Sequence, residues 1–191
     1  LKETINNAWG AIPLFWYSEL DGRSKRNLIS AIGENQKTIK WHAENEIPIE
    51  INDSHQWALR KTTDPIEVVS AYIATYNAKK LGVKYYIQQF MMNVPPEISP
   101  EMDIAKMLAK LELISELSDD TFTILRMIRT GLASLSVDED IAKGELASSI
   151  TIGMYLAKFL GGYVGIIMGV FLFFTSFKFT VNAILPANSS E

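Results

Sequence analysis

The feature that most limits the fold is an alternation of short apolar runs with longer stretches of helical periodicity. The apolar runs begin at residues 12, 47, 83, 121 and 162, so successive starts lie 35, 36, 38 and 41 residues apart. This is the length of one β/α unit. Strands that alternate with helices predict a parallel sheet with helices packed against it, and hence an α/β protein.

Local signals assign the individual segments. We expect strands at residues 12–17, 47–52, 83–90, 121–127 and 162–170, and helices at 24–43 and from residues 64, 100 and 138. In the helix from residue 64, Asp64 has the position of an N-cap and Glu67 that of the capping-box partner. Apolar spacing predicts that this helix buries one face, which carries Val68, Val69, Tyr72, Ile73 and Tyr76.

Two architectures accommodate these units. A doubly wound sheet closes at five or six strands, whereas a (β/α) barrel needs eight, so this chain would form roughly half of a TIM-type barrel. No glycine-rich loop of the dinucleotide-binding or Walker type is present, which counts against a nucleotide-binding sheet. We expect a partial barrel over residues 1–158, belonging to a longer protein, and a hydrophobic segment over residues 159–191.

The hydrophobic segment has two interpretations. Residues 159–177 carry no charge, and 19 such residues are enough to span a bilayer. Gly161, Gly165 and Gly169 recur at the spacing that lets membrane helices approach closely. Alternatively, the apolar run from residue 162 is the fifth strand, which the β/α period places there.

Composition excludes some classes of function. The net charge of −4 and the pI near 5.3 argue against binding to nucleic acid. There are no cysteines, so disulfides, thiolate metal sites and cysteine nucleophiles are excluded. A chain of this kind fits the cytoplasm, with membrane association as the alternative if residues 159–177 span a bilayer.

Polar side chains follow the expected strands, where parallel β/α proteins bind their ligands. Arginine forks bind carboxylates in two-point fashion, so recurring arginines favour a small acidic substrate. Asp53 and His55 are the candidate catalytic groups, and the candidate substrate-binding residues are Arg23, Arg60, Asn93, Arg126 and Arg129. The alternative is that these residues belong to solvated turns and surface ion pairs.

A cobalt-ligating motif is set aside. Asp53 and His55 fit the D-x-H-x-x-G pattern of base-off cobalamin proteins, but Ala58 occupies the glycine position. The S-x-L and G-G signatures of those proteins are matched only too far along the chain. Zinc is also disfavoured, because His42 and His55 are the only histidines and no compact third ligand accompanies them.

The order of the segments resembles a known family. The runs WHAENEIPIEINDSHQWALR, AKKLGVKYYIQQFMMN, FTILRMIRTGL and DEDIAKGELASSITIGMYLA are similar to the barrel subunit of adenosylcobalamin-dependent glutamate (methylaspartate) mutase and its relatives, over about residues 12–157. The resemblance implies a carbon-skeleton isomerase that binds an amino-dicarboxylate. It also implies adenosylcobalamin as cofactor, with the cobalt ligand supplied by a separate cobalamin-binding subunit or domain. With half a barrel, we expect the chain to be inactive alone.

Two other functions fit the same residues. The chain could be a membrane-tethered, non-enzymatic α/β module anchored by residues 159–177, or a small α/β domain that binds an anion through Arg60 and Arg126.

Overall fold

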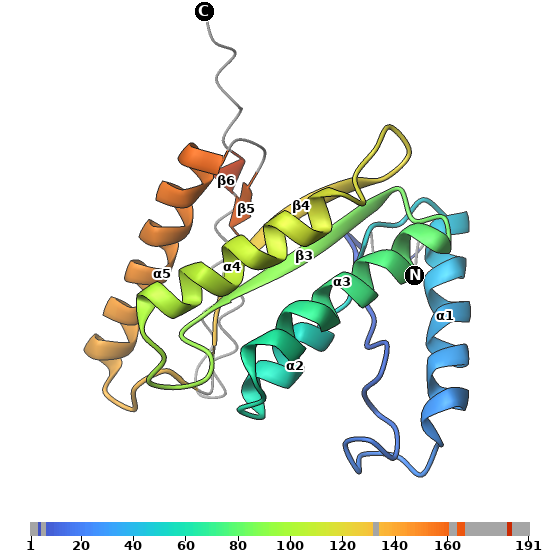
Figure 1. Ribbon diagram of the computed structural model, residues 1–191, viewed down its shortest axis with the longest axis horizontal. Coiled ribbons are helices and arrows are strands. Elements are labelled where there is room, and N and C mark those ends of the chain that lie inside the picture. The colour runs from blue at the N-terminus through green and yellow to red at the C-terminus, as the bar shows by residue number, and fades with distance from the viewer. Residues whose placement is uncertain (1–3, 5–6, 132–133, 161–163, 167–182, 185–191) are drawn as a thin grey trace, which may run out of the picture. The chain divides into compact units, whose positions relative to one another are not determined.

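The computed structural model describes residue 4 and residues 7–131, 134–160, 164–166 and 183–184 (Figure 1). Its elements, in chain order, are β1 (Gly10–Ala11), α1 (Leu28–Glu44), β2 (Ile49–Glu50), α2 (Asp53–Leu59), α3 (Asp64–Lys80), β3 (Tyr85–Met92), α4 (Pro100–Ser115), β4 (Thr123–Thr130), α5 (Glu139–Leu160), β5 (Val164–Ile166) and β6 (Ala183–Ile184). The chain is therefore an α/β protein, as the alternating pattern predicts.

The strands follow one another in the sheet in the order β1-β2-β3-β4-β5-β6. β1 with β2, β2 with β3 and β4 with β5 pair in parallel, whereas β6 is antiparallel to β5. β3 and β4 are also parallel, because Thr123 N donates to Lys84 O at 2.9 Å and Gly131 N donates to Met92 O at 3.0 Å. Each pair of successive parallel strands is joined through at least one helix, which is the predicted β/α connection.

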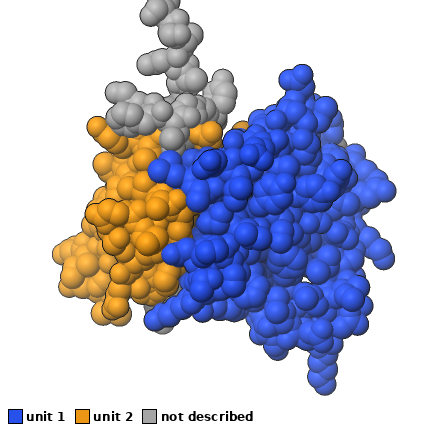
Figure 2. All heavy atoms as spheres, viewed as in Figure 1, with its two compact units in different colours: residues 1–88, 108–124 blue, residues 89–107, 125–191 orange. Residues whose placement is uncertain are grey.

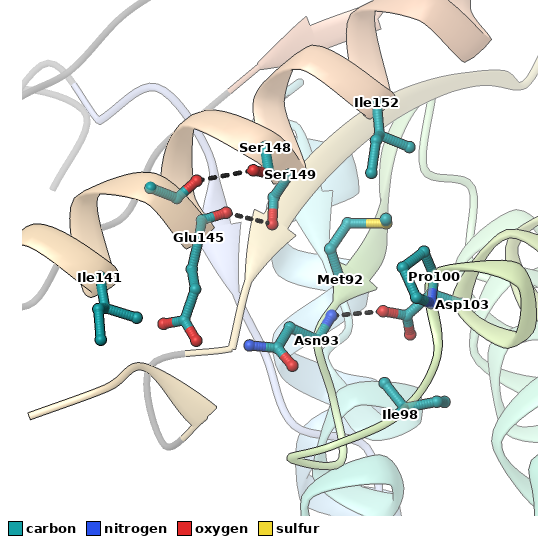
Figure 3. A pocket seen from close by; sticks show the side chains of 11 residues that line it. Met92, Asn93, Ile98, Pro100, Asp103, Ile141, Glu145, Ser148, Ser149 and Ile152 are labelled. Carbon is teal, nitrogen blue, oxygen red and sulfur yellow. Dashed lines mark hydrogen bonds between the residues drawn. The ribbon is translucent and has the colours of Figure 1, made fainter.

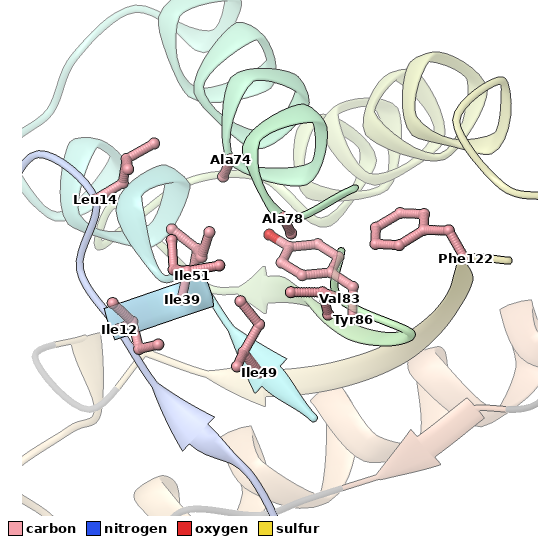
Figure 4. Packing of buried hydrophobic residues seen from close by; sticks show 10 residues of the cluster. All are labelled: Ile12, Leu14, Ile39, Ile49, Ile51, Ala74, Ala78, Val83, Tyr86 and Phe122. Carbon is pink, nitrogen blue, oxygen red and sulfur yellow. The ribbon is translucent and has the colours of Figure 1, made fainter. Parts of the chain in front are cut away.

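The chain divides into two compact units (Figure 2). Unit 1 comprises residues 1–88 and 108–124, and unit 2 comprises residues 89–107 and 125–191. The hydrophobic core of unit 1 collects side chains from the segment after β1, from β2 and β3 and the residues next to them, from α1 and α3, and from the segment before β4 (Figure 4). Its members are Ile12, Leu14, Ile39, Ile49, Ile51, Ala74, Ala78, Val83, Tyr86 and Phe122.

The first expected strand is wrong in its position. β1 covers only Gly10–Ala11, and residues 12–17 leave the sheet. Ile12 N still donates to Glu50 O at 2.9 Å, but Leu14 N and Phe15 N donate to the carboxylate of Asp53 instead of to a neighbouring strand. The segment then turns at Tyr17, whose φ is 61°. A side chain thus satisfies the backbone donors that a longer strand would have paired.

The predicted buried face of α3 is also wrong. Val69, Ile73 and Tyr76 are exposed, whereas the buried positions carry smaller or polar residues such as Ala71, Ala74 and Ala78. Alanines let the helix approach the sheet closely, which the larger apolar side chains would prevent. The N-cap is Thr63 rather than Asp64, and the carboxylate of Glu67 pairs with Lys110 of α4.

The other helices begin near the predicted residues. The side chain of Asn27 caps α1 by accepting a hydrogen bond from Ser30 N at 2.8 Å, three residues after the expected start at 24. Asp138 caps α5 by accepting from Asp140 N and Ile141 N. α4 begins at Pro100, as predicted.

The hydrophobic segment is described only in part. β5 lies within the predicted fifth strand. Residues 161–163 and 167–182, which make up most of the proposed membrane span, lie outside the described residues. Across the part of the chain that the structure describes, no helix combines the length and apolar character needed to cross a membrane.

Candidate functional site

Unit 2 contains a cavity of about 490 Å³ at the carboxyl end of β3 (Figure 3). This volume is in the range of about 300–1,000 Å³ that is typical of small-molecule sites. One part of its lining is apolar and consists of Met92, Ile98, Pro100, Ile141 and Ile152. The polar part consists of Asn93, Asp103, Glu145, Ser148 and Ser149, and Gly144, next to Glu145 on α5, completes the lining.

Asn93 directly follows β3 and connects the strand to both neighbouring elements. Its φ is 58°, in the left-handed region that asparagine tolerates better than most residues. Its backbone N–H donates to the carboxylate of Asp103 near the start of α4. Its side-chain amide donates to Ser134 O at 3.4 Å. These contacts hold the end of β3 next to the first turn of α4 and next to Ser134.

The α5 wall presents hydrogen-bond acceptors to the cavity. Ser148 Oγ donates to Gly144 O at 2.8 Å, and Ser149 Oγ donates to Glu145 O at 2.9 Å. Because these hydroxyl protons are used within the helix, the hydroxyl lone pairs remain available as acceptors. The carboxylate of Glu145 adds further acceptor capacity, although it also accepts from Ser136 N at 2.9 Å.

Acidic groups outnumber basic groups around this cavity. Asp103 and Glu145 line it, and no arginine or lysine is among the described lining residues. Lys106 lies next to Asp103, at 3.7 Å between Nζ and Oδ1, and donates to Val94 O at 2.8 Å. Both side chains of this ion pair are almost fully buried. The lining therefore favours a ligand whose polar end donates hydrogen bonds.

Asp53, a candidate catalytic group, is buried in unit 1 and accepts hydrogen bonds from the backbone. It lies in the first turn of α2 rather than in a loop, since residues 53–59 form a helix directly after Asn52. Its buried carboxylate accepts from Leu14 N at 3.1 Å and Phe15 N at 3.3 Å. Burial raises the pKa of Asp53 to about 7, although the two backbone donors oppose that shift. His55, the other candidate catalytic group, lies half-buried on the same helix.

Two candidate substrate-binding arginines of unit 1, Arg23 and Arg60, contact aromatic rings. The Arg60 guanidinium lies 4.2 Å from the ring centroid of Trp16 and donates to Gln56 O and Oε1 at 3.0 and 3.1 Å. Arg23 pairs with Asp21 and lies 4.0 Å from the ring centroid of Tyr17. Each guanidinium is thus held by its own neighbours, and the two do not share a partner among these contacts.

Arg126 and Arg129 were expected around the end of a fourth strand at residues 121–127, but both lie within β4, which continues to Thr130. Being three residues apart on a strand, they point to opposite faces of the sheet. Desolvation lowers the pKa of the half-buried Arg126. Neither lines the cavity.

Of the seven predicted site residues, Asn93 lines the cavity. Sequence reasoning missed Asp103, Glu145, Ser148 and Ser149, because it examined the strand ends and not the helices. A signal was present: residues 141, 145, 148 and 152 have the spacing of one helix face, and that face is half polar.

No group of three or more potential metal ligands occurs within the described ranges.

In comparisons with protein-family models, with curated proteins and with solved structures, nothing matches this chain.

Proposed function

We propose that this chain binds a small polar molecule in the cavity at the end of β3, with the amino or hydroxyl groups of the ligand directed at Glu145. One observation carries the proposal: a cavity of ligand size lies beyond the carboxyl end of a parallel strand and is lined by acceptors on its polar side. An ammonium group placed there would meet the Glu145 carboxylate, and a hydroxyl group of the ligand would meet the Ser148 or Ser149 hydroxyl oxygen farther along α5 (Figure 3). The apolar residues would receive a carbon chain.

A more specific proposal is that the chain is part of a (β/α) barrel. Its support is the strand order, in which each parallel strand lies beside the next one in sequence. A doubly wound sheet would reverse that order at its switch point.

The most specific proposal is the carbon-skeleton mutase, in which the ligand is an amino-dicarboxylate and adenosylcobalamin is the cofactor. The ammonium of such a substrate suits the acceptor-rich lining, but its carboxylates lack a basic partner there. His42 Nδ1–H donates to Thr38 O at 2.8 Å, and the Nε2 side of the ring packs against Gly10, so His42 does not fit a cobalt ligand. The family resemblance implies a cobalt ligand from a separate cobalamin-binding subunit or domain, and a cytoplasmic location belongs to the same proposal.

Calorimetry with three ligands tests the binding site. L-Glutamate carries an ammonium group, glutarate lacks it, and cadaverine carries ammonium groups without carboxylates. We expect glutarate to bind most weakly, and we expect Glu145→Gln to weaken L-glutamate binding by about ten- to a hundredfold, the value of a charged hydrogen bond. Arg129→Ala, outside the cavity lining, is the matched control.

The opposite pattern would reject the site. If Arg126→Ala or Arg129→Ala abolishes L-glutamate binding while Glu145→Gln leaves it unchanged, the arginines bind the ligand and the cavity does not. If none of the three ligands binds, the cavity recognises neither amines nor dicarboxylates, and the proposal is refuted.

A visible-absorption titration tests the assignment of the cobalt ligand. We expect the chain alone to leave the spectrum of adenosylcobalamin unchanged. A histidine-bound spectrum that His55→Ala abolishes would contradict that assignment.

A further inference from the structure

The two carboxylates that line the cavity at the end of β3 differ in what surrounds them. The carboxylate of Asp103, on α4, accepts from Asn93 N with one oxygen, and its Oδ1 lies 3.7 Å from Lys106 Nζ. The side chains of Asp103 and Lys106 are only 3% and 4% exposed. Solvent ions screen such a buried pair little, so its two charges compensate each other. Asp103 therefore adds little net charge to the cavity.

Glu145, on α5, is not compensated in this way. Its carboxylate accepts from the uncharged Ser136 N at 2.9 Å. Lys143, two residues before it in the sequence, pairs instead with Glu139 and Asp140, at 2.7 and 3.6 Å. No lysine or arginine is among the described lining residues of the cavity. The described lining therefore carries one net negative charge, and that charge lies on α5.

The rest of the lining offers different contacts at different places. Figure 3 shows Glu145 extending from α5 and Asp103 extending from α4, with Asn93 between them in this view. Ser148 and Ser149 follow Glu145 by three and four residues, or about 4.5–6 Å along the axis of α5. Their hydroxyl oxygens keep lone pairs that can accept from a hydroxyl group of the ligand. The apolar lining residues offer contact to a carbon chain.

We propose that the ligand of this cavity is an amino alcohol with a single positive charge and a short aliphatic chain, an inference that rests on the binding site proposed above. The ammonium group pairs with Glu145, and the hydroxyl group donates to Ser148 or Ser149. The chain lies against the apolar part of the lining. One cation, one hydroxyl donor and one apolar segment match the three kinds of contact that the cavity provides.

Charge disfavours two related classes of ligand. A carboxylate of the ligand would lie near acidic side chains without a cation among the described lining residues. A second ammonium group would lose hydration without meeting a second uncompensated carboxylate, because Lys106 already balances Asp103. The proposed class therefore differs from diamines and from the amino-dicarboxylate of the mutase proposal.

Calorimetry of the full chain with four five-carbon compounds tests the ligand class. 5-Amino-1-pentanol carries one ammonium and one hydroxyl group, pentylamine lacks the hydroxyl, cadaverine has a second ammonium, and L-glutamate adds two carboxylates. We expect 5-amino-1-pentanol to bind most tightly, by about tenfold or more over cadaverine and L-glutamate. Pentylamine should bind about two- to tenfold more weakly than 5-amino-1-pentanol, the value of one uncharged hydrogen bond.

Lys106→Met tests the charge argument directly. The substitution removes the charge that balances Asp103, so the cavity gains a second net negative charge. The ratio of the Kd of cadaverine to that of 5-amino-1-pentanol should fall by about tenfold. Lys143→Met is the matched control, because it removes a lysine charge close in sequence to Glu145 but outside the cavity lining, and it should leave that ratio unchanged. Circular dichroism checks that both variants are folded, and the wild-type series decides the ligand class if Lys106→Met does not fold.

The outcomes separate this inference from the proposed binding site. If cadaverine or L-glutamate binds the wild-type chain as tightly as 5-amino-1-pentanol or more tightly, the amino alcohol is overturned and the binding site stands. If none of the four compounds binds, both are refuted. Equal binding of pentylamine and 5-amino-1-pentanol would overturn the hydroxyl contact. The same ratio of Kd values in the wild type and in a folded Lys106→Met variant would overturn the single net charge.

Discussion

The buried carboxyl of Asp53 makes stability depend on pH in a way that one substitution can remove. Burial raises its pKa from 3.8 to about 7 in the folded chain. The folded state therefore binds more protons than the unfolded state between these two values, and stability falls as pH rises through that window. With these two pKa values, the loss between pH 5 and pH 8 is about 2.6 kcal/mol. Asp53→Asn should eliminate this dependence.

Urea unfolding at pH 5, 6, 7 and 8 measures the effect through the free energy of unfolding in water. The wild-type value should fall across the series, whereas the Asp53→Asn value should stay nearly level. The variant should lose about 1–3 kcal/mol at pH 5, because its single side-chain oxygen cannot accept from both Leu14 N and Phe15 N in the same geometry.

The control is Asp21→Asn. Desolvation opposes ionisation of Asp21, but hydrogen bonds from Arg23 and from backbone N–H groups outweigh it and hold the pKa at about 2, so its titration lies below this pH range. Its substitution should leave the slope between pH 5 and pH 8 intact. The reasoning fails if wild type and Asp53→Asn show the same slope.

Other substitutions test packing and backbone geometry. Lys110→Met should lower the free energy of unfolding by about 3–5 kcal/mol, because the buried Glu67 loses its ion pair with Lys110, and adding Glu67→Leu should recover most of the loss in the same urea assay. Gly10→Ala should destabilise by about 1–3 kcal/mol, because a Cβ there would lie 2.5 Å from His42 Nε2. Gly33→Ala in α1, where nothing lies within 4 Å of the added Cβ, should stabilise by about 0.5–1 kcal/mol, so thermal melting should move the two alanine variants in opposite directions. A higher melting temperature for Gly10→Ala, or full stability of Lys110→Met alone, would contradict these arguments.

Sequence periodicity was sufficient for the order and type of most elements. The starts of α4 and α5 were predicted within a residue or two, because Pro100 and Asp138 act through local backbone geometry and capping. Such signals need no tertiary information. The first strand could not be predicted in the same way, since its length depends on Asp53, 39 residues away from Leu14.

The orientation of α3 could not be predicted from the sequence for a different reason. Its period indicated a helix, but two faces of that helix are apolar: one is made of alanines and the other of large side chains. A hydrophobicity pattern gives greater weight to the larger side chains, whereas the available depth between helix and sheet determines which face is buried. The sequence therefore predicted the helix and reversed its orientation.

The candidate site was only partly predictable for a related reason. Asn93 could be found from the sequence, because it follows a strand and strand ends of parallel sheets bind ligands. Asp103 and Glu145 lie on helices, ten and 52 residues farther along the chain, and they reach the cavity only through tertiary packing. The arginines that suggested an acidic ligand lie outside the cavity lining, whereas the missed carboxylates lie within it. The chemical class of the proposed ligand therefore depends on which helix faces meet the end of β3, and Glu145→Gln rather than an arginine substitution is the variant that tests the proposal.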